Sequence, residues 1–194
     1  MRQLIYVDCC LRGLQSRTRR LGEAFLAALP ADWSIVPLPL ETMDLRPLVG
    51  DFLWDREACL ERGELSHPRF DLARQFAAAD AVVMAAPLWD LSFPALLKIY
   101  IENVSVDGIS FYADEMGLHG MCRGEDLVFL TTRGGVYEGA PDEMGSRYLE
   151  ALQGFFGFDR YHCVAADGLD AHPDRWEEIL GAACHRAREL ARSL

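Results

Sequence analysis

The sequence has 194 residues, of which 51% are hydrophobic and 25% are charged, and this composition predicts a single globular domain over residues 1–194. A formal net charge of −11 argues against binding of nucleic acid or of an anionic membrane surface, because both need clustered positive charge. No stretch is apolar for long enough to form a membrane helix, and the N-terminus lacks the pattern of a signal peptide, so we expect a cytoplasmic protein.

The cysteine spacing favours neither disulfides nor a metal site. No Cys-x-x-Cys motif or zinc-finger spacing occurs, and a bridge between the two adjacent cysteines near the N-terminus would be strained. We therefore expect six reduced thiols, most of them packed in the core: Cys9, Cys10, Cys59, Cys122, Cys163 and Cys184.

The first predicted element is a buried strand over residues 4–7, where four consecutive strand-forming residues show no alternation with polar ones. A glycine-containing loop follows. The chain then enters a helix at Ser16, because apolar residues recur at helical spacing between residues 19 and 29. A strand, a short loop and a helix start in this order can hold an anion in α/β proteins.

Strands and helices alternate along the rest of the chain. Strands are predicted over residues 33–38, 81–86, 126–131 and 161–166, and the proline in the first of these indicates a sheet edge. Helices are predicted over residues 51–62, 69–78, 95–104, 142–156 and 173–192. We expect residues 109–120 to form a surface excursion and residues 132–139 a glycine-rich loop.

This alternation predicts an α/β fold, because right-handed crossovers between strands produce a parallel sheet covered on both faces. Five such strands, with an anion loop after the first, fit a flavodoxin-like three-layer sandwich whose five-stranded parallel sheet has the order 2-1-3-4-5. In this topology ligands bind beyond the carboxyl ends of the strands. We therefore expect the loops after Val7, Ala86 and Thr131 to meet in one crevice.

The first of these loops has the residues of an anion site. Ser16 and Thr18 can donate hydrogen bonds to phosphate oxygens, and Arg12 and Arg17 can neutralise their charge. The free N–H groups at the start of the helix add partial positive charge. The alternative is that Ser16 only caps the helix and that both arginines are solvated.

The other two loops suit a planar ring with a phosphate tail. Residues 88–91 offer the indole of Trp89 and backbone N–H groups, and Gly134 and Gly135 allow the backbone to approach a ring closely because glycine has no Cβ. The alternatives are core packing for Trp89 and an ordinary turn for the two glycines. The expected convergence of three such loops favours a ligand site.

Two longer motifs lie in the fourth predicted helix and in the glycine-rich loop. Residues 96–104 read Leu-Leu-Lys-Ile-Tyr-Ile-Glu-Asn-Val, with Gly108 and Phe111 beyond, and residues 131–137 read Thr-Thr-Arg-Gly-Gly-Val-Tyr. Both resemble the FMN-dependent NADH-azoreductase and quinone reductase family, whose flavin loop contains Ser-Arg-Gly-Gly. The residues expected to bind the cofactor, from the loops and the resemblance together, are Cys10, Arg12, Ser16, Arg17, Thr18, Pro87, Leu88, Trp89, Asp90, Leu91, Thr132, Arg133, Gly134 and Gly135.

The resemblance implies an enzyme that carries FMN, takes electrons from NADH or NADPH, and reduces quinones or azo compounds in a ping-pong reaction through flavin N5. No side chain then needs to act as a catalytic acid or base, because the cofactor carries the chemistry. Family members are homodimers whose sites draw on both subunits. On the substrate side we expect Phe111, Tyr112 and Tyr137, although plain packing is the alternative for the first two.

Two positions depart from the family pattern and keep other functions open. Cys10 stands where the family has a serine, and Asp90 stands where it has an asparagine. One alternative is a non-enzymatic binding or sensing module of the same fold with weak or lost FMN affinity. A second is a phosphatase-like enzyme using Cys10 as its nucleophile, although six residues separate Cys10 from Arg17 and such enzymes have one fewer.

Overall fold

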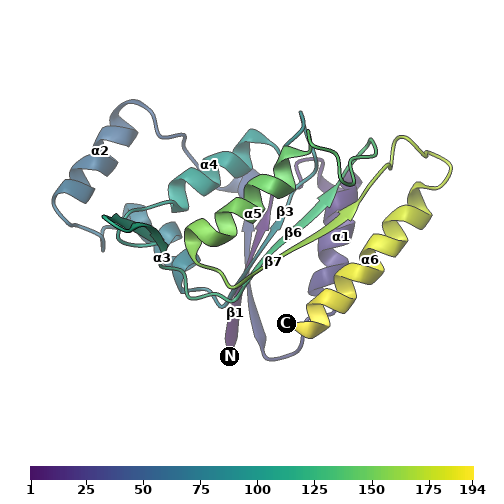
Figure 1. The fold of residues 1–194 in the computed structure, drawn as a ribbon, viewed down its shortest axis with the longest axis horizontal. Coiled ribbons are helices and arrows are strands. Elements are labelled where there is room, and N and C mark those ends of the chain that lie inside the picture. Colours follow the sequence, from purple (N-terminus) through teal and green to yellow (C-terminus); the bar gives the residue numbers. More distant parts are fainter.

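A sheet of five parallel strands forms the centre of the computed structural model, which describes all residues, 1–194 (Figure 1). The strand order is β2-β1-β3-β6-β7, which confirms the predicted order, and β2 lies at an edge as its proline indicated. The strands are β1 (Arg2–Asp8), β2 (Trp33–Pro39), β3 (Ala81–Ala85), β6 (Asp126–Thr132) and β7 (Arg160–Ala166).

Helices cover both faces of the sheet, as the alternation of elements predicted (Figure 1). One face packs against α1 (Arg17–Leu26) and α6 (Trp176–Ser193). The other packs against α3 (Asp71–Ala78), α4 (Ala95–Val104) and α5 (Met144–Phe156). A further helix, α2 (Gly50–Glu61), stands outside these layers, and Cys59 joins it to a small separate cluster with Phe70 and Ala73.

The central strands point successive side chains into two separate cores. In β1, Leu4 and Tyr6 pack towards α1 and α6, whereas Ile5 and Val7 pack towards α4 and α5. The two cores contain 21 and 20 buried residues, so neither face of the sheet is left to solvent. This explains why β1, β3 and β6 have continuous apolar sequences while the edge strands β2 and β7 are partly polar and partly exposed.

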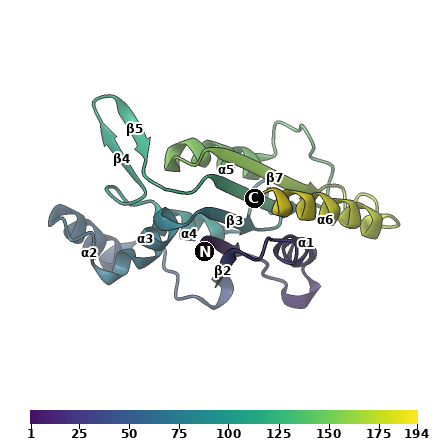
Figure 2. The same cartoon turned by 90° about the horizontal axis from the view of Figure 1, so that it is seen from below.

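The excursion predicted at residues 109–120 contains a β-hairpin, β4 (Phe111–Asp114) and β5 (Gly117–Gly120), which projects from the body at the same end of the molecule as α2 (Figure 2). The hairpin is anchored where the backbone of Gly120 packs against that of Gly157. The contact is so close that a Cβ on Gly120 would overlap the backbone of Phe156 and Gly157. The Cys122 N–H also donates to the Phe156 carbonyl at 3.0 Å. The hairpin is therefore fixed to the end of α5.

Two predicted helices begin later in the structure than in the sequence analysis. Helix α5 begins at Met144 because the carboxylate of Glu143 accepts the N–H of Ser146 and caps it. Helix α6 begins at Trp176. Three short 3₁₀ helices also occur in connecting segments: Gly13–Gln15, Leu40–Thr42 and Pro68–Phe70.

Arginine side chains lie at both ends of the outer strand β7. Arg186 of α6 donates to the Ala165 carbonyl at 2.7 Å, and Arg160 pairs with Asp126 of β6 at 2.8 Å. All six cysteines are free thiols, and four of them are buried. None of the helices has both the length and the apolar content that crossing a bilayer demands.

Candidate functional site

The loop between β1 and α1 presents the first turn of a helix to the carboxyl edge of the sheet. Ser16 is the N-cap of α1, and its hydroxyl oxygen accepts the N–H of Arg19 at 3.2 Å. This arrangement leaves the hydroxyl hydrogen of Ser16 able to donate elsewhere. The helix start therefore combines free N–H groups, a hydroxyl donor and partial positive charge, the features that bind a phosphate.

Asp8, the last residue of β1, holds this loop in shape. One carboxylate oxygen accepts the N–H of Cys10 at 2.9 Å, and the other pairs with the guanidinium of Arg19 at 3.2 Å. The end of β1 is thus tied to the first turn of α1 by a single side chain. Asp8 and Arg19 are both partly buried, which restricts their rotation.

The second loop turns sharply after β3. Trp89 and Ser92 exchange two backbone hydrogen bonds of 3.0 and 2.9 Å, with Asp90 and Leu91 between them. Both central residues have positive φ, 48° and 67°, as a two-residue type I′ turn requires. This conformation costs about 1–2 kcal/mol for each residue with a Cβ. The turn is held by the Met144 N–H, which donates to the Leu91 carbonyl at 2.8 Å.

The third loop contacts the first through two buried hydroxyls. Thr132 Oγ1 and Thr18 Oγ1 lie 2.6 Å apart, so one donates to the other. A fourth segment, residues 168–171 after β7, runs along the same loop. Backbone N–H groups of Leu169, Asp170 and Ala171 donate to carbonyls of residues 133 and 134, at 3.0, 2.9 and 3.0 Å. The glycine-rich loop is thereby hydrogen-bonded to the start of α1 on one side and to the segment after β7 on the other.

These four segments enclose a cavity of about 120 Å³ at the carboxyl edge of the sheet. The convergence predicted for the three loops is what the structure shows, since Ser16, Trp89 and Gly134 all line this one cavity. Its volume suits a phosphate-sized group and is smaller than the pockets of about 300 Å³ or more that hold whole ligands. The lining residues are Leu11, Arg12, Gln15, Ser16, Arg17, Thr18, Pro87, Leu88, Trp89, Thr132, Gly134 and Asp170.

Comparison with known proteins places this geometry in a family. A family model described as "Flavodoxin-like fold" matches residues 2–191. The FMN-dependent NADH:quinone oxidoreductase 2 of Clostridium acetobutylicum is 42% identical over 188 residues, which cover 91% of each chain. The chain belongs to the flavodoxin-like family of FMN-dependent NADH:quinone oxidoreductases.

Two other known proteins match over almost the whole chain. An FMN-dependent NADH:quinone oxidoreductase of Clostridium perfringens is 34% identical over 197 residues, or 99% of each chain. The crystal structure of azoreductase from Bacillus anthracis superposes with a TM-score of 0.89, is 29% identical and covers both chains completely. The resemblance drawn from the two sequence motifs is therefore confirmed at the level of the family.

Nine of the residues expected from the sequence to bind a cofactor line the cavity. They are Arg12, Ser16, Arg17, Thr18, Pro87, Leu88, Trp89, Thr132 and Gly134. The other five are absent from its lining, and four of them lie in or next to the loops that form it. Cys10 lies beneath the first loop, Asp90 and Leu91 form the tip of the second, and Gly135 lies beyond Gly134, with its missing Cβ 2.9 Å from the ring of Tyr137.

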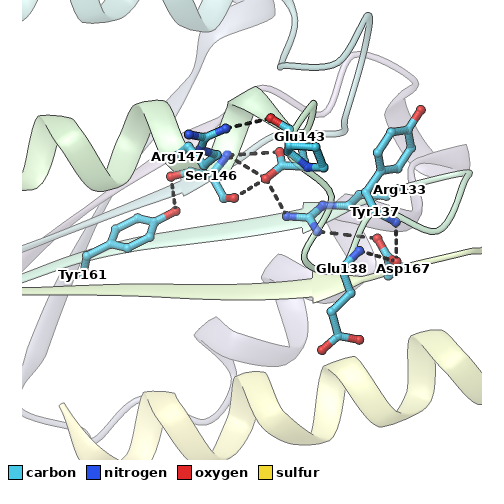
Figure 3. Close-up of polar contacts among 9 residues, drawn as sticks. Arg133, Tyr137, Glu138, Glu143, Ser146, Arg147, Tyr161 and Asp167 are labelled. Carbon is cyan, nitrogen blue, oxygen red and sulfur yellow. Dashed lines mark hydrogen bonds and ion pairs between the residues drawn. The ribbon is translucent and has the colours of Figure 1, made fainter.

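Arg133 points away from this cavity. Its buried guanidinium lies between the carboxylates of Glu143 and Asp167, at 3.2 and 3.5 Å (Figure 3). Asp167 also accepts the N–H groups of Tyr137 and Glu138 at 2.7 and 3.1 Å. Arg133 therefore fixes the glycine-rich loop to α5 and to the end of β7, and the contribution of its side chain to a bound flavin is indirect.

The three expected substrate-side residues do not line the cavity of their own chain. Phe111 packs on Phe155 of α5 with ring centres 4.5 Å apart, and Tyr112 stacks on His119 at 4.6 Å within the hairpin. Tyr137 lies on the glycine-rich loop, and Figure 3 shows its ring directed away from Arg133. Phe111 and Tyr112 therefore lie on the hairpin, outside the cavity of the chain.

The environment of Cys10 does not suit a nucleophile. The thiol is 2% exposed, and its sulfur lies 3.8 Å from the Ala85 carbonyl. Burial raises the pKa of Cys10 well above its usual range, and the neighbouring Asp8 carboxylate raises it further. A thiol that stays protonated at neutral pH cannot supply the thiolate that a phosphatase of this kind needs. The structure thus gives no support to the phosphatase alternative.

A larger hollow, of about 960 Å³, lies along the outer edge of β7 between α5 and α6. Its arginines are already paired within the chain. Arg133 bonds to two carboxylates, Arg147 donates to the Pro141 carbonyl, and Arg186 donates to the Ala165 carbonyl. The smaller cavity is the better candidate because the α1 start, the turn after β3 and the glycine-rich loop meet there, with Ser16, Trp89 and Gly134 all in its lining.

Sequence reasoning missed the acidic residues of the site. Asp8 ends β1, and Asp167 and Asp170 follow β7, so all three lie at the carboxyl edge of the sheet, and this position is the signal by which they could be found. The loop after the fifth predicted strand contains no hydroxyl cluster or paired glycines, so its sequence does not mark it as part of a site. The structure brings it against the glycine-rich loop all the same.

The cavity fits the phosphate end of FMN. Two arginines and a helix start supply positive charge, and Gly134 provides a wall in which a Cβ would overlap the Asp170 carboxylate. Ser16 and Arg17 would bind the phosphate, while Trp89 and Gly134 would flank the rest of the molecule. The residues present are therefore compatible with the cofactor that gives the family its name.

Proposed function

We propose that the protein is an FMN-dependent NADH:quinone oxidoreductase that also reduces azo compounds. The observation that carries this proposal is the single cavity joining the N-terminus of α1, the turn after β3 and the glycine-rich loop after β6. The names of relatives up to 42% identical, and of an azoreductase matching over the full chain, support the same activity.

When bound, FMN supplies the redox chemistry, accepting a hydride from NADH and passing electrons to the acceptor. The residues of the chain bind and orient. We propose that Arg12, Arg17 and the α1 N–H groups neutralise the phosphate, and that Trp89 and the glycine-rich loop position the ring. Because the bound cofactor carries the chemistry, no side chain needs to act as acid or base, and we expect a ping-pong reaction in which donor and acceptor use one site in turn.

The test is a spectrum of the purified protein followed by turnover assays. We expect a flavin absorption band in protein as purified or reconstituted with FMN, and NADH oxidation that depends on a quinone or an azo dye. Initial rates at several fixed acceptor concentrations should give parallel double-reciprocal lines. Protein that stays colourless with excess FMN and does not oxidise NADH would instead be a non-enzymatic module of this fold.

We also propose a homodimer in which the hairpin of one subunit completes the site of the other. Large apolar side chains are exposed on the two projecting elements, including Trp54 on α2 at 67% and Leu118 on the hairpin at 59% (Figure 2). Such a concentration of exposed apolar area is typical of a protein interface. Phe111 and Tyr112 would then lie on the substrate side of the partner's flavin.

A charged substitution in the hairpin tests this dimer. We expect Leu118→Glu to give a monomer in sedimentation and to lose most quinone reduction while still binding FMN, because the cavity lies in each chain. Ile35→Glu, on the exposed edge strand β2, is the matched control and should remain dimeric. A cytoplasmic location is proposed as well, supported by six free thiols, which fit a reducing compartment.

A further inference from the structure

Asp170 places a negative charge at the rim of the cavity. Its carboxylate pairs with the guanidinium of Arg17 at 2.7 Å, and both residues line the cavity. The Arg17 side chain is 28% exposed and that of Asp170 is 68% exposed. The arginine best placed at the helix start to meet an anion is therefore already neutralised by a carboxylate of the same chain.

The backbone fixes the position of this carboxylate. The N–H groups of Asp170 and Ala171 both donate to the Gly134 carbonyl, at 2.9 and 3.0 Å. The Asp170 side chain occupies the space that a Cβ on Gly134 would need. Asp170 can thus turn its side chain towards solvent, but its Cα stays beside the cavity.

We propose that Asp170 determines affinity and specificity at this site by competing with the phosphate of FMN for Arg17. The inference rests on the proposed flavin site. A phosphate entering the cavity must take Arg17 from Asp170, whose carboxylate then turns towards solvent. Since exposed ion pairs are weak, the phosphate can displace the carboxylate, but it is held less tightly than it would be without Asp170.

The expected consequence is that the protein prefers FMN to riboflavin, which lacks the phosphate, by a smaller ratio of affinities than it would without the Asp170 carboxylate. Removing the carboxylate while keeping its shape should tighten FMN binding and leave riboflavin binding unchanged. A role of Asp170 in shaping the glycine-rich loop would instead change the binding of both flavins alike. Comparing the two ligands therefore separates competition for Arg17 from a structural effect.

The experiment titrates full-length protein, stripped of flavin, with FMN and with riboflavin and follows the quenching of flavin fluorescence. For Asp170→Asn we expect a dissociation constant for FMN lower by about threefold to tenfold, and for riboflavin a change of less than about twofold. Asp174→Asn removes a charge from the same loop outside the cavity, and it should alter neither constant.

A second pair of variants tests the role of Arg17. In an Arg17→Ala background, Asp170→Asn should lose most of its effect on FMN binding, because the contested partner is gone. An unchanged effect in that background, weaker FMN binding by Asp170→Asn, or equal shifts for both flavins would each overturn the proposal. Failure of every protein, wild type included, to bind FMN would refute the flavin site itself and this inference with it.

Discussion

The carboxylate of Asp90 is the charge nearest the tip of the turn after β3. The residue is exposed and has a φ of 48°. Asparagine tolerates a left-handed backbone as well as aspartate does. Substitution by asparagine would therefore change the charge of the site and little else.

We expect Asp90→Asn to raise the reduction potential of bound FMN. A carboxylate near the flavin disfavours its anionic reduced form, and one charge acting through water-like screening corresponds to about 20–40 mV. Equilibrium titration against a redox dye measures the shift. Asp55→Asn, on the distant helix α2, should leave the potential unchanged, and an equal shift in both variants would show that only net charge matters.

Two tyrosine hydroxyls in the core differ in whether they have a hydrogen-bond partner. Tyr100 is fully buried and its hydroxyl has none, whereas Tyr161 donates to the Ser146 carbonyl at 2.9 Å. We expect Tyr100→Phe to leave the free energy of unfolding unchanged or raise it by about 1 kcal/mol, and Tyr161→Phe to lower it by about 1 kcal/mol. Urea unfolding of both variants provides the measurement, and equal losses would contradict the assignment.

At the level of single residues, the sequence predicted the donors of the site better than its acidic residues. Ser16 and Thr18 could be identified because hydroxyls at a helix start have a known role. Asp170 could not, because its importance depends on the β7–α6 loop folding back against Gly134, a contact between distant parts of the chain. Arg133 was placed in the correct loop, but the partners that direct its side chain lie 10 and 34 residues away.

Among the elements, the glycine-rich loop depends on one carboxylate for its shape. Asp167 accepts two consecutive backbone N–H groups, those of Tyr137 and Glu138, and pairs with Arg133. We expect Asp167→Asn to loosen residues 136–140, so that their amide hydrogens exchange at least about tenfold faster. Hydrogen exchange measured by mass spectrometry checks this. Glu177→Gln, exposed on α6, is the control, and unchanged exchange in Asp167→Asn would contradict the anchoring role.

The two strands of the hairpin β4–β5 could not be predicted from the sequence. Its strands have only four residues each, and their exposed faces are not strictly polar, so no alternation marks them. The hairpin is held by close backbone approach at Gly120 and Gly157, which no local pattern predicts. The long elements of the sheet and its helices were predictable because burial on both faces imposes apolar runs and helical spacing.

At the scale of the whole molecule, one buried carboxylate, that of Asp126 on β6, links this strand to side chains of the edge strand β7. Asp126 is 3% exposed and bonds to Arg160 and to His162, both at 2.8 Å. Burial alone would raise the pKa of Asp126, but the bonds from Arg160 and His162 outweigh it and hold the pKa below its usual range. A depressed native pKa means that this carboxylate stabilises the fold above the pKa of the unfolded chain and loses that effect as pH falls.

We expect Asp126→Asn to lower the free energy of unfolding at neutral pH by about 2 kcal/mol. The variant should also lose part of the decline in stability that the wild type shows between about pH 5 and pH 3. Chemical denaturation across this pH range measures both effects. Asp159→Asn, exposed at the start of β7, serves as control, and parallel pH profiles for wild type and Asp126→Asn would contradict the assignment.

The arginines at the outer margin of β7 have a consequence for how the protein behaves when crowded. An unprotected edge strand can pair with the same edge strand of another copy of the protein, and such pairing leads to fibres and precipitates. Arg186 occupies a carbonyl that such pairing would use, and Arg160 sets a second like charge farther along the margin. Concentrated solutions should therefore stay clear, and replacing Arg186 by a neutral residue would promote aggregation without first unfolding the domain.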